Sequence, residues 1–133
     1  MATPYQEKKL SDPEINIGDE PYFSAAAEDK LLLKKCSDCG EYHHYPRGMC
    51  PFCFSTNVAW TEAKGSGTIY SYSVSRRAGP VVYCIAYVTL AEGVTMMTNI
   101  VDCDLDDVRV GQKVKVVFKK TAGNFSMPMF TPG

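Results

Sequence analysis

The sequence has no apolar run that approaches the roughly 18 residues needed for a membrane-spanning helix. Residues 1–9 are polar and charged, with no apolar segment behind them, so an export signal is not predicted. These two absences favour a soluble, cytoplasmic protein that does not contact a membrane.

Histidine is also scarce. The chain has two, His43 and His44, and both lie between two pairs of cysteines. A serine nucleophile, or a nucleophilic Cys84 or Cys103, would therefore have no evident imidazole base, which argues against triad chemistry. We interpret Cys84 and Cys103 as small buried hydrophobic residues, because a reducing compartment gives them no reason to pair.

An excess of positive charge is the third absence. The formal net charge is -1, with 14 Lys and Arg against 15 Asp and Glu, and the pI is about 6.1. Proteins that bind nucleic acid through its phosphates usually carry a dense basic stripe and a much higher pI. Nucleic acid is therefore not the expected partner.

What the sequence does contain is two Cys-x-x-Cys pairs separated by ten residues, Cys36 with Cys39 and Cys50 with Cys53. Each pair can form a tight turn that aims two sulfurs at one point. Two such turns supply the four tetrahedral thiolates that zinc binds at roughly 2.3 Å. Gly40 follows the first pair, where the turn favours a positive φ.

Four thiolates form a closed shell of formal charge -2, which leaves no open position for a substrate or water. The pattern therefore predicts a structural Zn²⁺ rather than a catalytic one. Two alternatives remain less favoured: two disulfides in an exported domain, and ligation by His43 or His44 in place of a cysteine.

Three regions follow from the residue pattern. Residues 1–20 are polar, contain Pro4 and Pro13, and predict a flexible arm. Residues 21–62 predict a short helix that begins at Pro21, followed by the zinc ribbon. Residues 63–133 predict a small barrel and a C-terminal tail.

The barrel is predicted from the alternation of side chains along the second half of the chain. Strands are expected at 68–74, 81–90, 94–101 and 114–118, without long helices between them. Four or five short strands cannot bury both faces as an open sheet, so closure is expected. We predict a mainly β protein with a Greek-key barrel of the oligonucleotide/oligosaccharide-binding (OB) type. A small sandwich is the alternative.

Beside the cysteine pairs, several short segments share an order and a spacing typical of one family: Leu31–Leu33, Tyr45–Arg47, Gly65–Tyr72, Asp107–Gly111 and Pro128–Pro132. Together they resemble the rubredoxin-like zinc-ribbon plus OB-fold family associated with acyl-CoA, long known as a domain of unknown function. The resemblance covers residues 22–132 and leaves the arm outside.

This resemblance implies a non-catalytic subunit of a thiolase-type complex, a hetero-oligomer in which the chain docks on the catalytic subunit and helps to form the acyl-CoA channel. Claisen or retro-Claisen chemistry would then belong to the partner's cysteine. A coenzyme A thioester would be the ligand of the complex, and its phosphates favour guanidinium groups. Arg76 and Arg77 are the predicted coenzyme A contacts, with a solvated pair as the alternative. Arg47 is predicted to brace the ribbon or to dock on the partner.

Two other functions fit parts of the pattern. An OB barrel could bind single-stranded nucleic acid by stacking bases on tyrosines such as Tyr70 and Tyr72. Four thiolates could instead hold iron and carry electrons as in a rubredoxin. Salt-dependent oligonucleotide binding would favour the first function, and a red protein the second.

Overall fold

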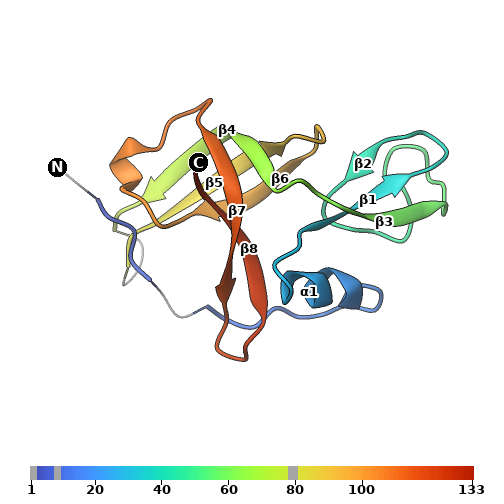
Figure 1. The fold of residues 1–133 in the computed structure, drawn as a ribbon, viewed down its shortest axis with the longest axis horizontal. Helices are drawn as coiled ribbons and strands as arrows, with labels where there is room; N and C mark the ends of the chain where they lie inside the picture. The colour runs from blue at the N-terminus through green and yellow to red at the C-terminus, as the bar shows by residue number, and fades with distance from the viewer. Residues whose placement is uncertain (1–2, 8–9, 78–80) are drawn as a thin grey trace.

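The computed structural model describes residues 3–7, 10–77 and 81–133. A three-stranded sheet lies beside a closed five-stranded barrel, and a short helix lies below the junction between them in Figure 1. The prediction of a mainly β protein with a zinc ribbon and an OB-type barrel is confirmed.

The three-stranded sheet is the ribbon. Its strands are β1 (Leu32–Cys36), β2 (Tyr42–His43) and β3 (Val58–Glu62), and β1 lies in the centre with both neighbours antiparallel. Leu33 and Cys36 on β1 are fully buried. The strand expected to lead from the three leucines into the first cysteine pair is therefore present.

The helix α1 (Glu20–Ala26) has Pro21 in its first turn, where a missing N–H leaves no hydrogen bond unmade. Tyr22, Phe23 and Ala26 are buried, and they form one face of the helix. The Phe23 ring meets Phe125 edge to face, with ring centroids 6.4 Å apart. The helix thus packs against the barrel as well as against the ribbon.

The barrel strands are β4 (Ser66–Ser75), β5 (Tyr83–Leu90), β6 (Thr95–Ile100), β7 (Lys113–Lys120) and β8 (Ser126–Pro132), with a 3₁₀ turn, η1 (Leu105–Asp107), before β7. They close in the order β4-β5-β6-β8-β7. Ile69, Val88, Ile100 and Phe130 are almost fully buried inside.

The strand β8 was expected only as a C-terminal tail. It pairs along its whole length with β7, and through Ile100 and Phe130 it meets β6 in parallel. Pro128 and Pro132 interrupt its alternation and remove backbone donors, which weakens a strand signal in sequence. Closure of the barrel nevertheless depends on this strand.

The described part of the segment expected to be a flexible arm has partners within the chain. The Thr3 N–H donates to Asp104 at 2.8 Å, and the Asp12 carboxylate accepts from the Thr121 hydroxyl at 2.6 Å. These contacts join residues more than a hundred positions apart. Hydrogen bonds of this kind leave no periodic pattern in the sequence.

Candidate metal centre and surrounding surfaces

The four cysteines of the two pairs converge in the ribbon. Cys36 and Cys53 have their sulfurs 3.6 Å apart, as do Cys39 and Cys50, and all four sulfurs lie within 4.8 Å of one another. Bonds of about 2.3 Å to a tetrahedral zinc require sulfur separations of about 3.8 Å. The four sulfurs are therefore spaced to accept such an ion.

The same backbone turn occurs twice around this cluster. In the first turn the Gly40 N–H donates to the Cys36 carbonyl at 2.9 Å, and in the second the Phe54 N–H donates to the Cys50 carbonyl at 2.9 Å. Gly40 has φ 78° and Phe54 has φ 65°. Together the two turns supply the four sulfurs that a closed shell requires.

The protonation of the thiols also favours a cation at this point. Backbone N–H groups, that of Cys39 first, lower the pKa of Cys36 to about 7. Although the Glu41 N–H acts to lower the pKa of Cys39, burial and the neighbouring thiols, with Cys50 foremost, raise it to about 12. Thiols this close cannot all ionise unless a cation lies between them, and four thiolates are the donor set that zinc prefers.

Neither histidine belongs to the cluster, which among the described residues consists of cysteines. The ring Nε2 of His43 accepts from the Arg47 N–H at 3.1 Å, and the ring Nε2 of His44 lies 2.9 Å from the Tyr22 hydroxyl. Burial lowers the pKa of both rings, that of His44 to about 4. The structure thus gives both rings other partners than a metal. Zinc, when bound, would cross-link the two turns and hold the ribbon together.

The arginines predicted as ligand contacts differ in their surroundings. Arg76 is engaged within the chain, 2.9 Å from the Asp106 carboxylate and 2.8 Å from the Thr3 hydroxyl. Arg77 is exposed, and so is Arg47, whose side chain makes no ion pair with another described residue. A phosphate would have to compete with Asp106 for Arg76 but not for Arg77.

The outward face of three barrel strands carries no charge. The sequences of β4, β5 and β6 contain no Asp, Glu, Lys or Arg, whereas β7 alone has four lysines. Ile85, Tyr87 and Met97 are exposed on this face, and Tyr87 lies opposite Met97 across the β5–β6 pair. We call it the uncharged face.

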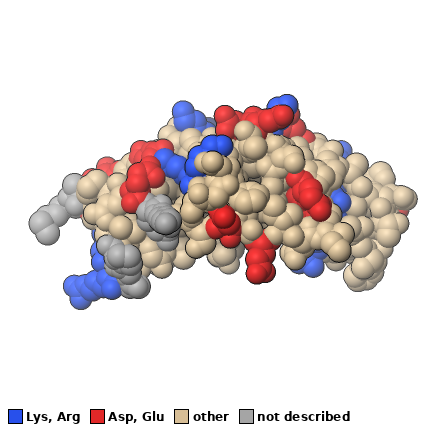
Figure 2. Space-filling view, turned by 90° about the horizontal axis from the view of Figure 1, so that it is seen from below, with Lys and Arg blue, Asp and Glu red and all other residues tan. Residues whose placement is uncertain are grey.

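Charged side chains elsewhere are mixed in sign. On the side of the molecule seen in Figure 2, acidic and basic groups lie among large uncharged areas and form no continuous basic stripe. A surface of this kind offers no track for a phosphate backbone.

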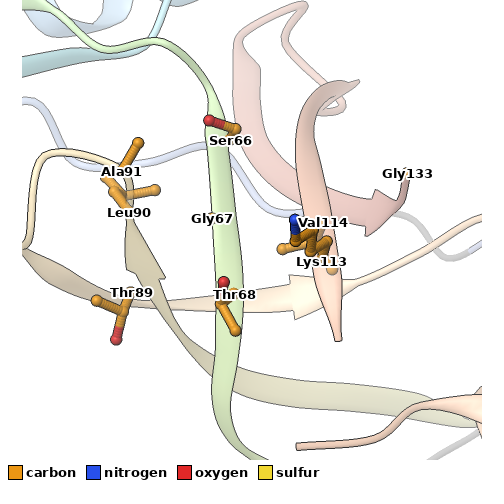
Figure 3. Close-up of a pocket in the computed structure, with 9 residues that line it drawn as sticks. All are labelled: Ser66, Gly67, Thr68, Thr89, Leu90, Ala91, Lys113, Val114 and Gly133. Carbon is orange, nitrogen blue, oxygen red and sulfur yellow. The ribbon is translucent and has the colours of Figure 1, made fainter. Parts of the chain in front are cut away.

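A cavity of about 370 Å³ lies where β4 pairs with both β5 and β7 (Figure 3). Ser66, Thr68 and Lys113 border it, and its other lining residues are apolar, glycine or threonine. Gly67 is required here, because a Cβ would lie 2.6 Å from Val88 Cγ1. The lining contains no histidine or carboxylate side chain, and Lys113 is the one ionisable side chain among the residues that border the cavity.

Among the described residues, no helix is both long enough and apolar enough to cross a membrane.

Two family models match consecutive parts of the chain. Residues 23–59 match the rubredoxin-like zinc ribbon domain of ChsH2, and residues 60–119 match the C-terminal OB-fold domain of ChsH2. The boundary between the two matches lies within β3.

Curated relatives of two kinds are similar to the chain. A probable enoyl-CoA hydratase alpha subunit of Thermomonospora curvata is 32% identical over 124 residues, which is 90% of this chain but 39% of that protein. A DUF35 domain-containing scaffold protein of Methanocaldococcus jannaschii is 34% identical over 96 residues, 68% of each chain. The chain thus spans well under half of the first relative and about two thirds of the second.

Solved structures share the architecture. A chain of an Ltp2-ChsH2(DUF35) aldolase superposes with a TM-score of 0.78 at 31% identity, covering 91% of this chain and 98% of that one. A DUF35 protein of unknown function from Sulfolobus solfataricus, 18% identical with a TM-score of 0.63, shares the fold.

We expect the purified protein to contain one zinc per chain and no iron, and to lose the ribbon fold when the metal is removed. Metal binding in such sites contributes on the order of 10 kcal/mol. Cys36→Ser should lose the metal, whereas Cys84→Ser, a buried cysteine outside the ribbon, should retain it. Elemental analysis and circular dichroism after chelation measure both effects. Full zinc occupancy in Cys36→Ser would contradict the assignment.

The lowered pKa of His44 predicts a pH dependence of stability. The ring has a pKa of about 4 in the folded protein, chiefly because of burial, against about 6.5 in the unfolded chain. Between these values the unfolded chain binds a proton that the folded one does not, so the free energy of unfolding falls as the pH decreases through this window.

His44→Gln, which keeps a polar partner for the Tyr22 hydroxyl, should show a smaller loss of stability on acidification than the wild type. Urea unfolding at about pH 7 and about pH 5 measures the difference. Because acid also protonates the thiolates in both proteins, only the difference between variant and wild type reports on His44. Identical pH dependence in both would refute the role of this ring.

Proposed function

We propose that the chain, which belongs to the DUF35 family of ChsH2-like zinc-ribbon and OB-fold proteins, is a non-catalytic subunit of a cytoplasmic acyl-CoA enzyme complex. It docks on a thiolase-type catalytic subunit and helps to form the channel for the acyl-CoA. The uncharged face is the observation that carries the proposal, because a monomeric soluble protein rarely leaves uncharged apolar side chains grouped on one surface.

The distribution of reactive groups supports a division of labour. Both histidines are held in the ribbon by their own hydrogen bonds, and the residues that line the cavity beside Gly67 include one ionisable side chain, that of Lys113. A four-thiolate zinc site has no open position for chemistry. The bond-making residues therefore belong to the companion subunit.

The names of relatives point the same way. The solved neighbour is an aldolase complex that contains a DUF35 chain, and a curated relative is described as a subunit of an enoyl-CoA hydratase. Both names describe a partnership with an acyl-CoA or carbon–carbon bond enzyme. Binding of single-stranded nucleic acid is disfavoured, because β4, β5 and β6 carry aromatic side chains but contain no Lys or Arg that would bind a phosphate next to a stacked base.

We expect substitutions on the uncharged face to weaken the complex. Tyr87→Asp places a charge where the companion would exclude water, and it should reduce affinity by about tenfold or more. Lys115→Ser on β7 is the matched control and should bind normally. Co-expression with a candidate thiolase-type catalytic subunit, followed by gel filtration and titration, measures both. Normal binding by Tyr87→Asp, with the wild type bound, would remove the uncharged face from the interface.

Arg77 is proposed to contact a phosphate of coenzyme A, since Arg76 is already paired with Asp106. Arg77→Ala should raise the KM of the complex for its acyl-CoA by about two- to fivefold, as expected for a partly exposed ion pair, and leave kcat unchanged. Arg76→Ala is the comparison and should have the smaller effect on KM. An unchanged KM in Arg77→Ala would show that this side chain is solvated in the complex.

A further inference from the structure

Phe54 occupies a backbone position that favours glycine. It ends the second cysteine turn with φ 65°, as Gly40 ends the first with φ 78°, and both donate the same 2.9 Å hydrogen bond. The left-handed region suits glycine, while a bulky residue with a Cβ is strained there. Local conformation therefore does not explain a phenylalanine at this position.

Packing does not explain it either. The Phe54 side chain is 71% exposed, so it contributes little to the core of the ribbon. Two other large apolar residues of the same turn region, Phe52 and Met49, are 61% and 49% exposed. A large apolar residue that is strained in its backbone and also exposed to solvent is expected to serve a function.

A shallow hollow of about 580 Å³ lies beside Met49 and Phe54, whereas Phe52 does not line it. Its lining includes Arg47, Met49, Pro51 and Phe54. Arg47 is exposed at its edge and makes no ion pair with a described residue. Apolar groups, a thioether and an unpaired guanidinium thus lie together on one small surface.

We propose that Met49, Phe52 and Phe54 form an anchor, here named the knuckle anchor, that inserts into an apolar pocket of the companion catalytic subunit. A carboxylate at the rim of that pocket pairs with Arg47. Phenylalanine, methionine and arginine are enriched in the centres of protein interfaces, and charge complementarity fixes their orientation. The proposal rests on the proposed function and identifies where the ribbon meets the companion.

A second copy of this chain is the less suitable occupant. In a two-fold contact the same patch faces itself, so Arg47 would face residues 45–54, which contain no Asp or Glu. The carboxylate of Asp38 in the first turn is already bonded to Ser55 and Asn57. The patch of residues 45–54 thus offers no anion of its own to Arg47, which favours a different protein as the source.

The test uses the full chain co-expressed with a candidate thiolase-type catalytic subunit. Phe54→Gly removes the anchor and relieves the strained backbone, so zinc content should stay at the wild-type value and the unfolding midpoint should be equal or higher. Affinity for the companion should nevertheless fall by about tenfold or more.

Phe54→Asn, which also tolerates a positive φ, should behave like Phe54→Gly. Arg47→Glu should weaken binding to the companion further at low salt. Val110→Ser, which removes a 66% exposed apolar residue of the barrel, should bind as the wild type does.

The outcomes separate this proposal from the one on which it rests. If the wild type binds and Phe54→Gly binds with an affinity within about twofold of it, the knuckle anchor alone is overturned. Loss of a central anchor would give a larger effect. A wild-type chain that does not bind the companion would overturn both proposals. A dimer of the isolated chain that Phe54→Gly dissociates would also overturn this one, because the occupant would then be a second copy.

Discussion

The ribbon depends on four sulfurs that meet at one point. The sheet around them is small, because β2 has only the residues Tyr42 and His43 and most of the loop that follows it is exposed. Two buried sulfurs, those of Cys36 and Cys50, face inward and two face outward, so the cluster lies at the boundary of the core. A cation there both neutralises the thiolates and fixes the two turns, which in turn set where Arg47 and Phe54 point.

The barrel differs from the ribbon in that it exposes a surface without charge while keeping an apolar core. Its charged side chains are concentrated on β7 and in the loops, while β4 to β6 carry hydroxyl, aromatic and thioether groups outward. This segregation has no benefit for the folding of the barrel, since the inward residues already fill its core. It is understandable if the outward surface is covered in the assembled enzyme.

Sequence reasoning succeeded where a property is local. The cysteine spacing predicted the cluster because two short turns need no information from elsewhere, and alternating or β-branched runs bounded by turn residues located β4 to β7. It did not find β8 as a strand, because Pro128 and Pro132 disrupt its pattern, nor the engagement of Arg76 by Asp106, which depends on a pairing across thirty positions. The exposed side of β5 was hidden by the same limit: alternation identifies two faces but not which one a partner covers.

The parallel contact between β6 and β8 is the seam of the barrel, since the described residues show a single paired position there, Ile100 with Phe130. The start of the chain lies over this seam, where Tyr5 and Leu10 border a narrow gap together with Ile100 and Met129. The Tyr5 N–H donates to the Cys103 carbonyl at 2.9 Å, and the Val101 N–H donates to the Phe130 carbonyl at 2.9 Å. If the barrel opens at the seam, both hydrogen bonds break together, so the amide protons of Tyr5 and Val101 should exchange with solvent at similar rates.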